Sequence, residues 1–143
     1  MSVLEQVQDD VKTALKAGDR ARANALRLVA NELQKAAKDN GDEPIEVLQR
    51  ERKRRLEAAK AYRDGGREDL AAAEDGEAEL IQGYLPAQLS DDELRAIVGD
   101  VVAESGASSP KELGKVMSAV MPQVKGRADG KRVSAMVKEL LTA

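Results

Sequence analysis

The sequence contains neither cysteine nor histidine, and these two absences exclude several kinds of site at once. Disulfides, Cys/His zinc sites, thiolate nucleophiles and Ser-His-Asp triads cannot form. Tyr62 and Tyr84 are the only aromatic residues, so platforms for stacking nucleic-acid bases are lacking. No apolar run approaches the roughly 20 residues that span a bilayer, and the N-terminus does not resemble a secretory signal. We therefore expect a cytoplasmic protein without membrane contact, metal, cofactor or catalytic residues.

Charge is divided unevenly along the chain, although the net charge is only −3. The segment from Gly106 to Ala143 has seven basic and three acidic side chains, whereas residues 1–105 have 16 basic and 23 acidic ones. The front of the chain is therefore acidic and its tail is basic. A basic tail favours a polyanion or an acidic partner surface, but a solvated surface explains a moderate imbalance equally well.

The spacing of apolar residues predicts an all-α fold. Glycine and proline divide the sequence into amphipathic segments, and no stretch shows the alternation of β-branched residues that is typical of a strand. In the first part we expect four helices, bounded near residues 2–18, 19–40, 44–65 and 67–84. The inner face of the third helix is predicted to carry Ile45, Leu48, Leu56, Ala59 and Tyr62.

After Pro86 three short segments repeat one apolar template, i, i+3, i+4, i+7, i+8, with N-terminal signals at Ser90, Ser109 and Asp129. Pro122 is expected to end the second of them. Because such short helices are not stable singly, we expect them to pack into one three-helix unit. The predicted organisation is an N-terminal helical subdomain, residues 1–85, followed by a small C-terminal three-helix subdomain, residues 88–143.

Basic residues gather around the predicted turn between the last two helices. Exposed amides of Gly126 and Gly130, together with the positive end of the next helix dipole, would favour an anion such as phosphate there. From the residues alone we favour another interpretation, in which Gly126 ends one helix, Asp129 caps the next and the cations are solvated, because basic turns are common and four cations do not specify a ligand. Gly114, in a helix interior, indicates either a close helix contact or a surface that approaches a partner, and we favour the helix contact. The candidate phosphate-binding residues are Lys115, Lys125, Gly126, Arg127, Lys131 and Arg132.

A second basic run, Arg50 and Arg52–Arg55, lies in the predicted third helix. Consecutive residues point around most of a helix, so these cations cannot all face one phosphate track. We interpret them as a solvated surface with intrahelical ion pairs such as Glu46–Arg50 and Glu51–Arg55.

Two stretches of the sequence are distinctive beyond their physical pattern. The stretch Gly-Lys-Val-Met-x-x-Val-Met-x-x-Val-Lys-Gly-Arg-Ala-Asp-Gly-Lys-x-Val at residues 114–133 resembles the tail domain of the B subunit of glutamine-dependent aminoacyl-tRNA amidotransferase. Together with Tyr-Leu-Pro-x-Gln-Leu-Ser at residues 84–90, it makes the whole chain similar to the stand-alone YqeY-like proteins. In the amidotransferase this tail reaches the tRNA, and amide transfer belongs to other domains.

The resemblance implies a tRNA-associated binding module that contacts tRNA phosphates without catalysis of its own. A second hypothesis is a protein-interaction module that docks on an aminoacyl-tRNA synthetase or an amidotransferase. A third is an enzyme in its own right, a carbon–nitrogen ligase with glutamine as amide donor. We rank the third last, because the chain has no Lys-Ser-Ser amidase pattern and no ATP-binding loop.

Overall fold

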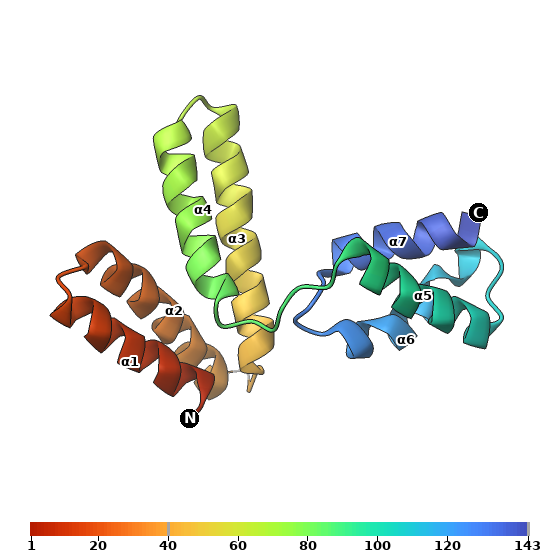
Figure 1. The fold of residues 1–143 in the computed structure, drawn as a ribbon, viewed down its shortest axis with the longest axis horizontal. Helices are drawn as coiled ribbons and strands as arrows, with labels where there is room; N and C mark the ends of the chain where they lie inside the picture. Colours follow the sequence, from red (N-terminus) through yellow and green to blue (C-terminus); the bar gives the residue numbers. More distant parts are fainter. Residues whose placement is uncertain (40, 143) are drawn as a thin grey trace. The chain divides into compact units, whose positions relative to one another are not determined.

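The computed structural model describes residues 1–39 and 41–142, and in this part of the chain every regular element is a helix (Figure 1). The all-α prediction is therefore confirmed. The elements are α1 (Val3–Lys16), α2 (Arg20–Asp39), α3 (Pro44–Asp64), α4 (Glu68–Gln82), α5 (Asp91–Ser105), the 3₁₀ turn η1 (Pro110–Glu112), α6 (Leu113–Val124) and α7 (Gly130–Thr142).

Local sequence signals set most helix ends. The Ser90 hydroxyl accepts the Glu93 N–H at 3.1 Å while the Glu93 carboxylate accepts the Ser90 N–H, so the capping box predicted at α5 is formed. Asp19 accepts the Arg22 N–H at 3.1 Å and caps α2. At the end of α5, Gly106 has φ +70°, a left-handed conformation that favours glycine.

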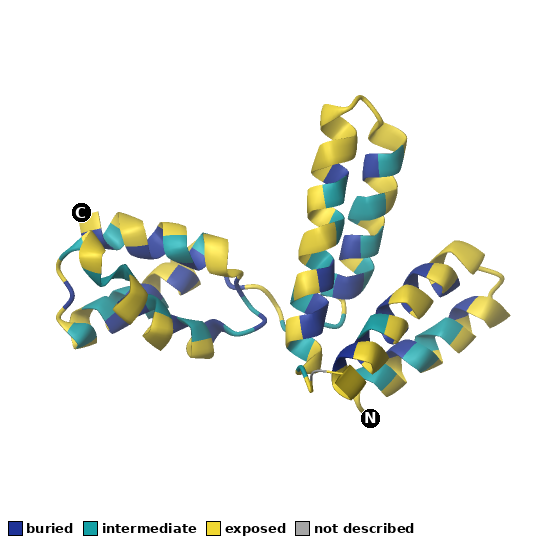
Figure 2. Ribbon diagram, turned by 180° about the vertical axis from the view of Figure 1, so that it is seen from behind, coloured by how far each residue is buried: buried dark blue, intermediate teal, exposed yellow. Residues whose placement is uncertain are grey.

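The chain divides into two compact units, Met1–Leu85 and Pro86–Ala143. In the first unit, α1 packs on α2 and α3 packs on α4, and buried positions follow the seam between α3 and α4 (Figure 2). One core cluster joins residues of all four helices. Its buried members are Val7, Leu26, Val29, Ala30, Leu33, Ala36, Val47, Leu48 and Ile81.

The predicted inner face of α3 is only partly correct. Leu48 and Ala59 are buried, but Leu56 and Tyr62 are each 38% exposed. Two packed helices bury only a narrow stripe of each other, so residues to the side of the α3–α4 seam remain in solvent. Glu51 is instead 2% exposed, and its carboxylate accepts a 2.9 Å hydrogen bond from Arg54 Nη1. Arg55 approaches Glu51 at 3.8 Å, which confirms the predicted Glu51–Arg55 pair.

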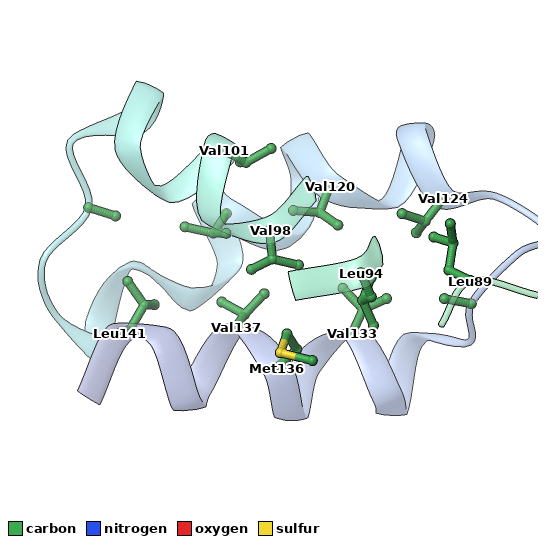
Figure 3. Packing of buried hydrophobic residues seen from close by; sticks show 13 residues of the cluster. Leu89, Leu94, Val98, Val101, Val120, Val124, Val133, Met136, Val137 and Leu141 are labelled. Atoms are coloured by element: carbon green, nitrogen blue, oxygen red, sulfur yellow. The ribbon is translucent and has the colours of Figure 1, made fainter. Parts of the chain in front are cut away.

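The second unit has its own core, in which side chains from α5, α6 and α7 point toward one another (Figure 3). Leu89, which precedes α5, belongs to this core and is 3% exposed. The remaining buried members are Leu94, Val98, Val101, Ala107, Val116, Val120, Val124, Ala128, Val133, Met136, Val137 and Leu141.

Two sequence predictions for this unit are wrong. Pro122 lies inside α6 rather than at its end. An interior proline removes one N–H from the helix ladder and its ring crowds the carbonyl four residues earlier, but α6 nevertheless continues to Val124, which is buried. Gly114 does not mark a close contact: it is exposed, and a Cβ built on it would meet no atom within 4 Å.

Candidate nucleic-acid interface

The loop between α6 and α7, residues 125–129, is a tight turn held by backbone hydrogen bonds. The N–H groups of Arg127 and Ala128 both donate to the carbonyl of Val124, at 2.8 and 3.2 Å. Gly126 has φ +79°, a backbone conformation that side-chain-bearing residues rarely adopt. Ala128 is fully buried and fixes the loop to the core. The loop is therefore a rigid platform on which flanking charged side chains are displayed.

Asp129 turns the chain from this loop into α7. Its carboxylate accepts the Arg132 N–H at 2.7 Å, so the predicted N-cap of α7 is confirmed. The first N–H groups of α7 have no intrahelical acceptor, and they give this end of the helix a partial positive charge. Lys131, in the first turn of α7, is exposed and forms no ion pair or side-chain hydrogen bond with the residues that the structure describes.

The segment that precedes α5, residues 86–90, packs against the same loop. The Leu89 N–H donates to the Arg127 carbonyl at 2.8 Å, and Gln88 Nε2 donates to the Gly126 carbonyl at 2.9 Å. In the opposite direction, Arg127 Nε donates to the Ala87 carbonyl at 3.2 Å. The two stretches that are distinctive in the sequence are therefore bonded to each other, and part of their residue choice is explained by this contact.

The structure brings four of the predicted cations to the end of the second unit where the α6–α7 loop lies: Lys125, Arg127, Lys131 and Arg132. Lys125 caps α6 and is half-buried, and Arg127 follows two residues later. Arg132 forms a 2.8 Å ion pair with Asp91, whose own side chain is 80% exposed. Gly126 is buried, so its contribution is the shape of the turn.

Lys115 lies apart from this group. Ten residues separate it from Lys125, which places it about 15 Å away along α6. Its ammonium donates to the Ser105 carbonyl at 3.1 Å, at the end of α5. A cation at a helix C-terminus is favoured by the helix dipole. Lys115 therefore does not share one bound phosphate with the loop cations.

Acidic groups also lie beside the loop. Hydrogen bonds from Ser90, backbone first and then side chain, lower the pKa of Glu93. Slight desolvation of this exposed carboxylate opposes the shift, and the charge of Arg127 adds to it. Glu93, Asp91 and Asp129 thus hold the surrounding backbone and cations in place. Sequence reasoning missed Gln88 as a contact of the loop and Asp91 as the partner of Arg132 in α7. The sequence feature that could have indicated these contacts is the distinctive stretch at residues 84–90, which contains Gln88 and ends one residue before Asp91.

A family model described as Yqey-like protein matches residues 4–141, which include both units, the 86–90 segment and the loop. The chain belongs to the YqeY-like family.

The YqeY-like chain is also similar to a protein of Pyrenophora tritici-repentis (strain Pt-1C-BFP) named altered inheritance of mitochondria protein 41, mitochondrial. The two are 28% identical over 152 aligned residues, which cover 99% of this chain and 82% of that protein.

Other parts of the YqeY-like chain offer less chemistry. A shallow groove of about 290 Å³ between α3 and α4 is lined by Arg52, Leu56, Asp75 and their neighbours. A second depression contains Tyr84, whose hydroxyl donates to Asp10; burial, followed by this hydrogen bond, raises the pKa of Tyr84. Within residues 1–39 and 41–142, no three acidic side chains are grouped as a metal site would need. Over the same residues, no helix has the length and apolar character to cross a membrane.

Proposed function

We propose that this YqeY-like protein is a tRNA-associated accessory module that contacts tRNA phosphates and has no catalysis of its own. Its phosphate-binding surface is formed by Lys125, Arg127, Lys131 and Arg132 around the α6–α7 loop, with Lys115 as a separate contact on α6. The family membership supports this proposal through the resemblance to the tail of the amidotransferase B subunit. Possible protein partners are an aminoacyl-tRNA synthetase or an amidotransferase, and the proposed compartment is the cytoplasm.

The observation that carries the proposal is the way in which the two arginines are anchored. Arg127 uses Nε to reach the Ala87 carbonyl, and Arg132 uses Nη2 to reach Asp91. A guanidinium has five N–H donors in a fixed plane, so each arginine is oriented by one contact and keeps further donors for an anion. Lys131 adds an exposed cation beside the positive end of α7.

This surface would position a nucleic acid rather than recognise its sequence. Lys and Arg contacts to phosphates carry no base information, and aromatic residues for stacking are absent from the interface. We therefore expect binding that weakens steeply with salt, because each neutralised phosphate releases counterions. Base changes in the tRNA should matter little.

The experiment is a titration of folded tRNA at several salt concentrations. In the variant Lys125→Gln with Lys131→Gln, the loss of two phosphate contacts should lower the slope of log affinity against log salt by about 1.4 to 1.8. Arg127 is left intact, because its replacement would also remove the hydrogen bond to Ala87. The matched control, Lys53→Gln with Lys60→Gln on α3, removes the same charge and should keep the wild-type slope.

Two results would contradict the proposal. If the loop variant binds tRNA like the wild type, the phosphate surface is not at the α6–α7 loop. If the wild type binds no tRNA at any salt concentration, the protein-interaction hypothesis replaces the tRNA-binding one. Circular dichroism of each variant checks that helicity is unchanged.

A further inference from the structure

Helix α2 is basic, although the unit that contains it is acidic. Its 20 residues include five basic and two acidic side chains. Six of its exposed residues recur at intervals of three or four and carry only cations or amides. We call them the α2 stripe: Arg20, Asn24, Arg27, Asn31, Lys35 and Lys38.

The spacing places the α2 stripe on one face of the helix. At 3.6 residues per turn, its members fall within about 80° of the helix circumference and extend about 27 Å along the axis. Leu26, Val29 and Leu33 lie on the other side of α2 and are buried in the core of the unit. The stripe is therefore a continuous solvent-facing surface on a helix that the core holds in place.

The cations of the α2 stripe differ from most of those of α3 in their electrostatic environment. On α3, Arg50, Lys53, Arg54, Arg55 and Arg63 each lie within 4.0 Å of a carboxylate oxygen. Among the residues that the structure describes, none of the four stripe cations forms an ion pair. Arg52 and Lys60 of α3 resemble the stripe cations, because in the part of the chain that the structure describes they form no ion pair either. The two acidic residues of α2, Glu32 and Asp39, lie beside the stripe without pairing to it. The positive charge of the stripe is left without an internal partner.

The two asparagines add a second observation. Asn24 and Asn31 are exposed and form no side-chain hydrogen bond with any residue in the described ranges. Asparagine is a poor helix former compared with alanine, so neither residue helps the helix. Amides alternating with cations form a surface that donates hydrogen bonds to oxygen-rich anions along its whole length.

We propose that the α2 stripe is a second nucleic-acid contact, which binds the phosphate backbone of structured RNA. The inference rests on the proposed function, because that function supplies the RNA. Arg, Lys and Asn side chains are typical donors to phosphate and sugar oxygens. A membrane surface fits less well, because an interfacial helix inserts its apolar face, and that face of α2 is buried in the core.

The first test removes charge from the middle of the stripe. Arg27→Gln with Lys35→Gln should lower the salt slope for folded tRNA by about 1.4 to 1.8, the range for two phosphate contacts. The control Lys53→Gln with Lys60→Gln has the same net charge and should keep the wild-type slope. The charge-preserving exchange Arg27→Lys with Lys35→Arg should also keep it. A stripe variant with the wild-type slope would overturn the inference.

The second test separates binding from stability. Asn24→Ala and Asn31→Ala should each raise the melting temperature, because alanine is the better helix former. Each should also weaken tRNA binding by about tenfold or more, the worth of one hydrogen bond to a charged group, while the salt slope stays constant. If the two asparagines had only a structural role, the more stable alanine variants would bind tRNA as tightly as the wild type. Unchanged affinity in both variants would overturn the assignment of the amides.

The outcomes distinguish this inference from the proposed function. If the loop variant loses affinity and the stripe variant does not, the α6–α7 surface stands and the stripe inference fails. If only the stripe variant loses affinity, the stripe stands and the loop assignment fails. Co-sedimentation with phosphatidylserine-containing vesicles tests whether the α2 stripe binds a lipid surface instead of RNA. If the stripe charges are needed for vesicle binding and not for tRNA binding, the partner is a lipid surface and the RNA inference is overturned.

Discussion

At the scale of single residues, Gln88 and Arg127 bind the 86–90 segment to the α6–α7 loop from opposite sides. Each donates to a backbone carbonyl across the contact, at 2.9 and 3.2 Å. Forming a hydrogen bond to a partly buried carbonyl adds little net stability. Removing the donor costs more, because the carbonyl is then left without a partner. These hydrogen bonds give the stretch around Gln88 a structural role in the second unit.

Replacing Gln88 tests this contact. Gln88→Ala leaves the Gly126 carbonyl without its donor and should lower the free energy of unfolding by about 1 kcal/mol. The matched control is Gln123→Ala on α6, where the side chain is exposed and its hydrogen bond to Ala119 is 3.4 Å long. Urea unfolding of both variants measures the difference. Equal stability of the two variants would show that the Gln88 contact contributes nothing.

Glu93 gives the second unit a pH dependence of known sign. Because the pKa of Glu93 is lowered in the folded protein from its ordinary 4.5, the stabilisation is fully present above about pH 4.5 and is lost as pH falls through the folded value. Glu93→Gln has no charge to lose and keeps a side chain suited to a capping box. Urea unfolding at pH 7 and pH 3 should show a smaller loss of stability in the variant than in the wild type. An equal loss in both would refute the assignment.

At the scale of helices, caps and periodicity predict that a helix is present and where it ends better than they predict which of its faces is buried. Ser90 and Asp129 are caps as predicted, because a cap depends only on neighbouring residues. Leu56 and Tyr62 fit the apolar period of α3 and are nevertheless exposed. Burial there depends on how many helices surround α3 at that height, and periodicity within one helix does not contain that information.

Glycines inside helices give a prediction at this scale. Gly76 lies in the middle of α4, is exposed, and a Cβ on it would meet no atom within 4 Å. Gly76→Ala should therefore stabilise the first unit by about 0.5 to 1 kcal/mol. Gly106→Ala is the opposing control, since φ +70° at the end of α5 disfavours a side chain and should make that variant less stable than the wild type. Thermal unfolding of both variants measures the signs, and a Gly76→Ala variant that melts below the wild type would contradict the prediction.

For the candidate site, the sequence predicts the chemistry of the loop but not its contacts. The basic composition around Gly126 is visible in the sequence, and so is the Asp129 cap. The partners of Arg127 and Arg132 lie 40 and 41 residues away, a separation over which local pattern carries no information. The α2 stripe was missed for another reason. Counting charge over the first 105 residues averages the basic helices α2 and α3 with acidic segments such as α4.

At the scale of the whole molecule, the chain forms two compact units, and the contacts of the 86–90 segment show where the second one begins. Ala87, Gln88 and Leu89 all bond to the α6–α7 loop, so these residues belong to the second unit. A unit of this size buries a small core and has little stability to lose. Its ability to fold alone therefore depends on the segment that precedes α5.

Two fragments test this dependence. Residues 86–143 should fold alone, with helical circular dichroism and a cooperative thermal transition. Residues 91–143 keep every helix of the unit but lose Leu89, which is 3% exposed in the core and whose burial is worth about 1.5 to 3 kcal/mol. The hydrogen bonds from Gln88, Leu89 and Arg127 and the Ser90 cap of α5 are lost with it, at roughly 1 kcal/mol each. We therefore expect the shorter fragment to be largely unfolded at 25 °C.

The fragments also decide between two sources of stability for the second unit. Equal melting of the two fragments would mean that the helical core of α5, α6 and α7 suffices and that the 86–90 contacts add nothing. A longer fragment that remains unfolded at low temperature would mean that the unit needs residues 1–85 to fold. If fragment 86–143 folds and fragment 91–143 does not, the contacts of residues 86–90 with the rest of the unit are needed for folding. In that case the position of the loop cations depends on this segment, and the tRNA binding proposed for the second unit should be lost together with it.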